Sequence, residues 1–180
     1  SAMPAAKPKL KPTAARPRPL ALCAALARGG HSVTLLFGDE AGTAFDGLAE
    51  HCSRVLPVRR RRLGAAVAEV VRTGRFDLAH VDRSAAGLLP AAMPLPAVLD
   101  AGVCTSLRYE RELLAYNALG RAVRRAVLAG QRRHEAGLLA RFAQVIVAAE
   151  DDAAALGSLR GERAPRVQVV PSPVDHERFA

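Results

Sequence analysis

Residues 26–37 read Leu-Ala-Arg-Gly-Gly-His-Ser-Val-Thr-Leu-Leu-Phe and join a predicted helix to a predicted strand. Strong helix formers fill residues 20–28, and Gly29 and Gly30 follow them with the left-handed backbone that ends many helices. The apolar and β-branched run over 31–37 is typical of a strand that is buried on both faces. This stretch therefore predicts a helix that ends at Gly29, followed by an inner strand of a sheet.

The alternation of helix and strand continues to the end of the chain. Further strands are predicted over 54–58, 76–81, 97–100, 144–148 and 166–170. Helices are predicted between them over 43–52, 63–72, 84–92, 106–142 and 151–159. Strands that are separated by helices of about ten residues imply right-handed crossovers and a parallel sheet with helices on both faces. The predicted fold class is therefore α/β, a single Rossmann-like domain.

The stretch over 106–142 has few helix breakers and is far longer than the average helix. It predicts one long amphipathic helix or two abutting ones, because apolar residues recur at helical spacing with arginines between them. The apolar positions are Leu107, Leu114, Leu119, Val123, Val127, Leu138 and Phe142. We expect this face to pack on the sheet and the arginines to face solvent. The alternative is that the helix lies on an anionic membrane surface.

The 180 residues fit one domain. Residues 1–19 begin with Ser-Ala-Met, which resembles a protease-cleavage remnant, and continue in a Pro- and Lys-rich segment that we expect to be extended and flexible. Residues 20–170 form the predicted domain. No apolar run is long enough to cross a bilayer and no secretory pattern opens the chain, so we expect a cytoplasmic protein.

Composition and motifs narrow the classes of function. The formal net charge of +9 permits anionic partners, but the arginine runs at 59–62, 124–125 and 132–133 lack nearby aromatic residues, which disfavours nucleic acid. Three widely spaced cysteines without a Cys-x-x-Cys pair indicate buried free thiols and no metal site. The chain has no Gly-x-Gly-x-x-Gly, P-loop or Gly-x-Ser-x-Gly motif. We therefore expect no cofactor.

Polar residues at the ends of the predicted strands are the candidates for a ligand site, because open parallel sheets bind ligands beyond the carboxyl ends of their strands. His80 lies in a strand that is predicted to be buried, and Asp82 and Arg83 follow that strand. Asp100 follows the next strand and Glu150 a later one. Each has a structural alternative: a satisfied core histidine, an ion pair or helix cap for Asp82 and Arg83, and a turn for Asp100.

Four segments, in order and at the right separations, resemble the amino-terminal domain of the family-four retaining glycosyltransferases of GT-B fold. Residues 26–36 resemble the passage Leu-Ala-x-x-Gly-His-x-Val-x-Leu, and residues 76–82, Phe-Asp-Leu-Ala-His-Val-Asp, resemble Phe-Asp-Val-Val-His-x-His. Residues 142–150, Phe-Ala-Gln-Val-Ile-Val-Ala-Ala-Glu, resemble Phe-Asp-x-Val-Ile-x-x-Ser-Glu. Residues 167–179, Val-Gln-Val-Val-Pro-Ser-Pro-Val-Asp-His-Glu-Arg-Phe, resemble Val-x-Val-Ile-Pro-Asn-Gly-Val-Asp-x-x-Arg-Phe. In that family the last segment leads into a second domain, so residues 171–180 are expected to begin a hinge.

The resemblance implies a retaining transfer of a sugar from a nucleotide-sugar donor to a hydroxyl of a glycan, lipid or small-molecule acceptor. It implies that this half binds the acceptor, that the donor binds an absent second domain, and that the chain is inactive alone. His80 matches the family's histidine near the reacting sugar and is the catalytic candidate. Glu150 is the donor-side candidate, and the acceptor-side candidates are Asp82, Arg83, Asp100, Ser106, Arg108, Tyr109 and Glu110.

The sequence also departs from the family pattern. Members normally begin with a strand and a Gly-rich loop, whereas residues 4–19 here are rich in Pro and Lys, so the first strand is expected to be missing or altered. Its absence leaves the strand over 33–37 with an unpaired edge, and such edges recruit other chains, so we expect a homodimer there. Asp82, Ala149 and the pair Ser172-Pro173 replace other residues of the family's motifs.

A second interpretation competes with the transferase half. A degenerate Rossmann-like module would keep the fold but bind an anionic partner, or an anionic membrane at its periphery, through the arginine-rich helix. The absent Gly-rich loop favours this module. The terminal hinge motif favours the transferase, because a free-standing module has no need of a lead into a second domain.

Overall fold

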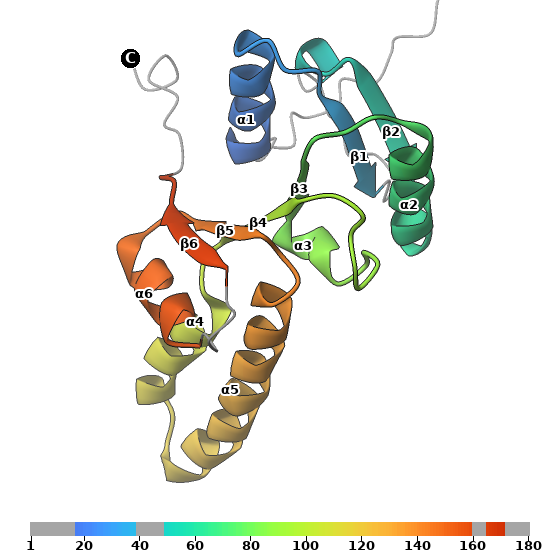
Figure 1. The fold of residues 1–180 in the computed structure, drawn as a ribbon. Coiled ribbons are helices and arrows are strands. Elements are labelled where there is room, and N and C mark those ends of the chain that lie inside the picture. Colours follow the sequence, from blue (N-terminus) through green and yellow to red (C-terminus); the bar gives the residue numbers. More distant parts are fainter. Residues whose placement is uncertain (1–16, 39–48, 160–164, 172–180) are drawn as a thin grey trace, which may run out of the picture. The chain divides into compact units, whose positions relative to one another are not determined.

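A computed structural model describes residues 17–38, 49–159 and 165–171 of the chain (Figure 1). The chain divides into two compact units, Ser1–Arg60 with Ser172–Ala180, and Arg61–Pro171. The carboxyl-terminal unit contains the larger sheet and all but one of the helices longer than one turn that the described residues form.

The first unit pairs two parallel strands beside a helix. Helix α1 (Pro17–Arg28) is followed by β1 (Thr34–Gly38), the short 3-10 helix η1 (Ala49–His51) and β2 (Arg54–Val58). Gly30 adopts a φ of +80°, and the His31 amide returns to the Leu26 carbonyl at 3.0 Å, so the glycine pair ends α1 as predicted.

The second unit is a four-stranded parallel sheet in the order β3-β4-β5-β6. Its strands are β3 (Ala79–Asp82), β4 (Ala97–Gly102), β5 (Gln144–Val147) and β6 (Arg166–Val169). Its helices are α2 (Leu63–Thr73), α3 (Arg83–Ala86), α4 (Thr105–Glu112), α5 (Ala118–Leu139) and α6 (Glu150–Ser158), with 3-10 turns η2 (Arg60–Arg62) at its start and η3 (Leu113–Ala115) after α4.

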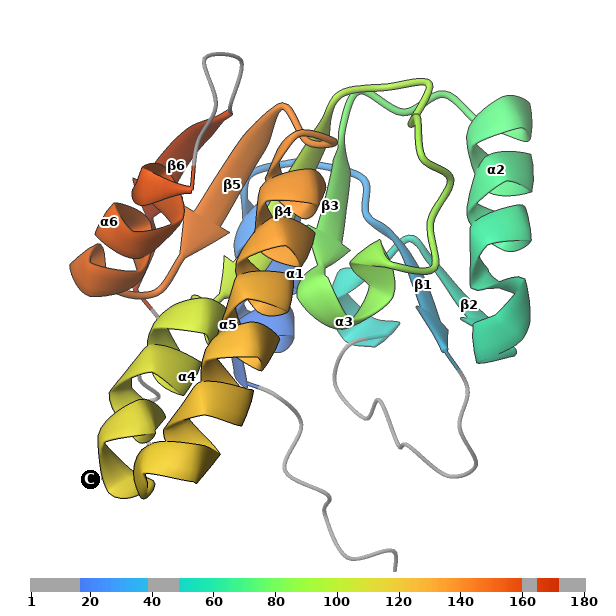
Figure 2. The ribbon, with the colours of Figure 1, turned by 90° about the horizontal axis from the view of Figure 1, so that it is seen from below.

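The core of this unit lies between the sheet and the helices α3 to α6, which lie on one side of it (Figures 1 and 2). Alternate strand residues point into it, so Val81, Leu99 and Val145 are buried against Leu139 and Leu156 of the helices. The residues between them point to the other face of the sheet. This alternation places the polar candidates of β3 and β4 on the face opposite the aliphatic core.

The α/β fold with parallel strands and interleaved helices confirms the predicted fold class. Strand β2 has the predicted bounds, whereas β3 begins three residues late and α3 ends six residues early. Of the helix predicted over 43–52, residues 43–48 lie outside the described residues, and the described part forms only η1. Cys23 and Cys104 are buried free thiols, as predicted, and Cys52 is half-buried.

The described strands form two sheets in place of one. In a doubly wound sheet of order 3-2-1-4-5-6 the first strand joins the two halves. No strand precedes α1 in the part of the chain that the structure describes, and β1 has β2 as its only described strand neighbour. Residues 4–12, where a first strand would lie, are outside the described ranges, so the missing strand and the edge dimer stay predictions.

The long stretch over 106–142 is two helices, the second of the predicted alternatives. It breaks at Tyr116 and Asn117, and the Asn117 side chain accepts a hydrogen bond from the Gly120 amide at 2.9 Å as the cap of α5. The expectation that the whole apolar face packs on the sheet is wrong for the first half of α5. Leu119, Val123 and Val127 are exposed there, because α5 extends beyond the sheet before it reaches the core at Leu138.

Candidate functional site

His80 and Asp100 come together from neighbouring strands. Asp100 lies opposite Asp82 in the β3–β4 register, and its Oδ2 lies 3.5 Å from Nε2 of His80. The other oxygen, Oδ1, accepts a hydrogen bond from the Gly102 amide at 3.2 Å, which holds the carboxylate at the end of β4. A carboxylate fixed in this way can orient an imidazole for proton exchange with a ligand hydroxyl.

The position of His80 differs from the prediction in two respects. Its side chain is 26% exposed, while the neighbouring Val81 fills the core, because successive strand residues face opposite sides of the sheet. His80 is thus not a residue of the aliphatic core. Its strand is also an edge strand among the described strands, and the histidine lies two residues before the strand ends.

Asp82 and Arg83, for which we considered a mutual ion pair or a cap of the following helix, have different partners, and the cap is confirmed for Asp82. Asp82 caps α3, since its side chain accepts from the Ser84 amide at 2.9 Å and from the Ser84 hydroxyl. The guanidinium of Arg83 donates to the Val103 carbonyl at 2.6 Å and to Oε1 of Glu135 at 2.8 Å. The residue after β3 thus holds the loop after β4.

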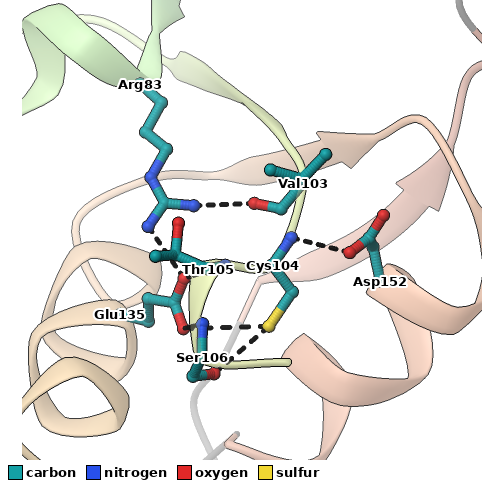
Figure 3. A network of polar contacts seen from close by, with 7 residues as sticks. All are labelled: Arg83, Val103, Cys104, Thr105, Ser106, Glu135 and Asp152. Carbon is teal, nitrogen blue, oxygen red and sulfur yellow. Dashed lines mark hydrogen bonds and ion pairs between the residues drawn. The ribbon is translucent and has the colours of Figure 1, made fainter. Parts of the chain in front are cut away.

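Glu135 of α5 is the centre of this network, which Figure 3 shows from close by. It is 3% exposed, and its Oε1 accepts from the Thr105 amide at 2.8 Å while Oε2 accepts from the Ser106 amide at 3.1 Å. The residue at the start of α4, Cys104, makes no side-chain cap of its own. Glu135 therefore satisfies the free amides of α4 from another helix.

Burial alone would raise the pKa of Glu135, but hydrogen bonds from Ser106, from Arg83 and from the Thr105 amide outweigh it and hold the pKa below the usual glutamate value. The carboxylate is therefore charged at neutral pH, which a buried position permits only with such partners.

A second carboxylate extends the network to α6. Asp152 accepts a hydrogen bond from the Cys104 amide at 2.8 Å, and the Cys104 thiol lies 3.3 Å from the Ser106 hydroxyl and 3.7 Å from Oε2 of Glu135. Three consecutive amides, 104 to 106, are thus each held by a carboxylate. We call residues 103–106, which join β4 to the first turn of α4, the site loop.

The remaining candidates on α4 and α6 do not join these groups. Arg108 lies 3.6 Å from Glu112 and 5.7 Å from the centre of the Tyr109 ring. Glu110 pairs with Arg132 of α5 at 2.9 Å. Glu150 is exposed at the first position of α6.

A pocket of about 330 Å³ opens between α4 and α6. Two of the predicted acceptor-side residues, Ser106 and Glu110, line it, with an ion pair of 2.6 Å between Arg111 and Asp151 across it. Leu107 and Leu159 give it apolar walls.

The sequence reasoning missed Glu135, Asp152 and Cys104. A signal for Glu135 was present, because it follows Leu128 by seven residues and precedes Leu138 by three, so a carboxylate stands on the buried side of an arginine-rich helix. Asp152 gave no such signal, since an acidic first turn suits any helix.

No group of three or more His, Cys, Asp or Glu side chains in the described ranges is placed to hold a metal ion. Within the same ranges, every helix is too short or too polar to cross a bilayer.

The family model Glycosyltransferase Family 4 matches residues 20–178, which is most of the chain. Neither the curated proteins nor the solved structures gave a match. The matched stretch includes every described strand, the His80–Asp100 pair and the site loop. The chain therefore belongs to glycosyltransferase family 4, as the amino-terminal domain of a GT-B-type enzyme.

Proposed function

We propose that this domain is the acceptor-binding half of a retaining glycosyltransferase. It would present a hydroxyl acceptor, a glycan, a lipid or a small molecule, to a sugar that a second domain carries as its nucleotide-sugar donor. Family membership supports sugar transfer. The observation that carries the proposal is the pair of His80 and Asp100, which sits near the carboxyl ends of adjacent parallel strands, where open sheets bind ligands.

In this proposal His80 contacts the reacting sugar, and Asp100 orients its imidazole. Hydrogen bonds from the ring to a sugar hydroxyl would strengthen as charge develops in the transition state. The Arg83 guanidinium donates to the Val103 carbonyl of the site loop, and the Ser106 amide donates to Glu135, so in this proposal both residues hold that loop in place. Asp82, Arg108, Tyr109 and Glu110 stay candidates for acceptor contact, and Glu150 for the donor side.

The test uses an enzyme that contains this domain. His80→Ala should lower the turnover number by roughly 10²-fold or more with little change in melting temperature. His31→Ala, which removes an exposed histidine of the first unit, is the matched control and should leave turnover unchanged. A His80→Ala enzyme that keeps its turnover but melts early would show a structural histidine and contradict the proposal.

We further propose that the chain is inactive alone, because GT-B chemistry takes place between two domains. Incubation with UDP- and GDP-sugars should release no nucleotide above the rate of a blank. Turnover by the pure chain would refute this part without touching the role of His80.

The binding module remains the second candidate function. The exposed apolar residues of α5 favour it, since a helix that only packed on the sheet would bury them. Docking and sugar transfer are compatible in one protein. The His80→Ala enzyme separates them, because a pure binding module has no turnover to lose.

A further inference from the structure

The first half of α5 carries an apolar face that no described part of the chain covers. Leu119, Val123 and Val127 are 77%, 62% and 49% exposed. They follow one another at intervals of four residues, so they form a continuous line on one side of the helix. Three of the six large apolar side chains that are exposed in the described residues lie on this line, which we call the α5 stripe. Such a concentration marks an interaction surface.

No charged side chain interrupts the stripe. Ala122 and Ala126 are exposed beside it, and Gly130 continues it by one turn. At 100° per residue Gly130 falls within the sector of the stripe, and Ala126 and Ala122 lie roughly 20° and 60° beyond its edge. A flat surface could therefore approach the helix along its first three turns.

The other side of α5 is occupied by the protein itself. Leu128, Leu138 and Glu135 are buried, and Arg132 pairs with Glu110 of α4. Helices α4 and α5 lie side by side and extend away from the sheet in both views (Figures 1 and 2). The stripe thus belongs to the part of the second unit that extends furthest from its core.

Arginines border the stripe. Arg124 lies roughly 100° around the helix from Val123 in one direction and Arg125 roughly 160° in the other, and Arg133 and His134 close the carboxyl end of the stripe. The guanidinium of Arg124 lies over the Tyr116 ring, 4.4 Å from its centre. Arg125 and Arg133 are exposed and form no ion pair with any described residue. Long arginine stems let the guanidinium reach lipid headgroups while the helix face between them enters the acyl boundary.

We propose that α5 docks this protein on an anionic membrane surface, with the α5 stripe inserted at the headgroup level and the arginines on lipid phosphates. The exposed line and its arginine borders are the pattern of helices that lie in the interface plane. The contact is peripheral, since no described helix could span a bilayer. It stands independently of the proposed sugar transfer.

A second copy of the chain fits the stripe less well than a membrane does. A twofold dimer through this face would bring the arginines of one α5 near those of the other, because residues 118–134 contain no acidic side chain. Like charges would meet across a partly desolvated interface without an acidic partner, which costs binding energy. Anionic lipid supplies the complementary charge.

The test measures sedimentation of the chain with vesicles. Vesicles of equimolar phosphatidylcholine and phosphatidylglycerol should pull the chain down, and vesicles of phosphatidylcholine alone should bind it far more weakly. Added salt should weaken the anionic binding, because screening shortens the reach of the arginine charges.

Matched variants localise the contact. Leu119→Ser should weaken binding by roughly tenfold or more, whereas Leu78→Ser, at a side chain that is 53% exposed away from the stripe, should not. Arg125→Gln/Arg133→Gln should weaken binding by about thirtyfold, about fivefold for each charge. The double variant Arg75→Gln/Arg166→Gln has the same net charge and should bind nearly as the parent does.

The chain contains no tryptophan, so one introduced residue reports insertion directly. Val123→Trp should shift its emission to the blue on anionic vesicles, and Leu78→Trp should not. Failure of the parent chain to sediment with anionic vesicles would overturn the proposal. Equal losses in the stripe and control variants would also overturn it. So would a homodimer in solution that Leu119→Ser dissociates, because a second copy would then cover the stripe.

Discussion

Replacement of Glu135 by glutamine tests how much one buried carboxylate stabilises the site loop. Its Oε1 accepts from Arg83 and from the Thr105 amide, and its Oε2 from the Ser106 amide. Glutamine has the same shape but one acceptor oxygen. If that oxygen takes the place of Oε1, the new NH2 group faces the Ser106 amide, which then loses its acceptor.

The loss follows from these contacts. A buried donor without an acceptor costs about 1–3 kcal/mol, and the charge-assisted bond from Arg83 is weakened by about 1 kcal/mol more. We expect the free energy of unfolding to fall by about 3 kcal/mol, which lowers the melting temperature of a domain of this size by roughly 6 to 12 °C. Glu135→Ala should cost more, about 3–5 kcal/mol, because both amides and the Arg83 guanidinium lose their partner.

Thermal melts followed by circular dichroism at pH 7 measure the effect. Glu69→Gln is the matched control: it neutralises an exposed glutamate that pairs with Arg72 at 2.7 Å and should leave the melting temperature unchanged. If Glu135→Gln melts with the parent, the network carries no stability and the reasoning fails.

The same variant gives a pH dependence. The pKa of Glu135 lies below its ordinary value of 4.5 in the folded chain, so the folded state favours the charged form. Its stabilisation is complete above the unfolded pKa and is lost as the pH falls through the lower folded pKa. The stability gap between parent and Glu135→Gln should therefore be wide at pH 7 and narrow below pH 4.5. A gap that widens on acidification would contradict this sign.

Two further predictions use the same melts and a thiol assay. Gly64→Ala in α2 should lower the melting temperature despite the better helix propensity of alanine, because the new Cβ would clash with the Leu88 carbonyl oxygen. Gly137→Ala, whose Cβ would meet nothing within 4 Å, should raise the melting temperature, and equal shifts in the two variants would refute the steric argument. Burial and the neighbouring Cys52 raise the pKa of Cys23 to about 11, so a disulfide reagent at pH 8 should label Cys52 well before Cys23. Mass spectrometry of the labelled peptides gives the readout, and rapid labelling of Cys23 in the native protein would contradict its burial.

Local sequence signals predicted much of the fold because each depends on neighbours in the chain. The Gly30 turn and strand β2 are set by propensities within a few residues, and both lie where they were predicted. Two abutting helices were one of the predicted alternatives, but the position of the break at Asn117 was not predicted, because asparagine is a mild helix breaker until its side chain accepts from the Gly120 amide. The resemblance of four short segments to a glycosyltransferase family predicted the class of reaction, which helix and strand propensities do not indicate.

Contacts between distant segments were beyond the sequence. Helical periodicity shows that Leu119, Val123 and Val127 share a face, but it does not show whether that face is covered. Asp82 and Arg83 are adjacent, yet they serve α3 and the site loop, which only the arrangement of the strands decides. The pairing of His80 with Asp100 likewise needs the β3–β4 register.

The carboxylates that hold the site loop also set an order of assembly. The Thr105 amide donates to Glu135, 30 positions later in the chain, and the Cys104 amide donates to Asp152, 48 positions later. Contacts of such separation form only after the intervening chain has collapsed. During synthesis, β3, β4 and α4 would therefore leave the ribosome before the site loop has its native conformation. The loop would adopt that conformation once α5 and α6 had packed on the sheet. Hydrogen exchange during refolding should then protect the amides of 104–106 among the last of this unit.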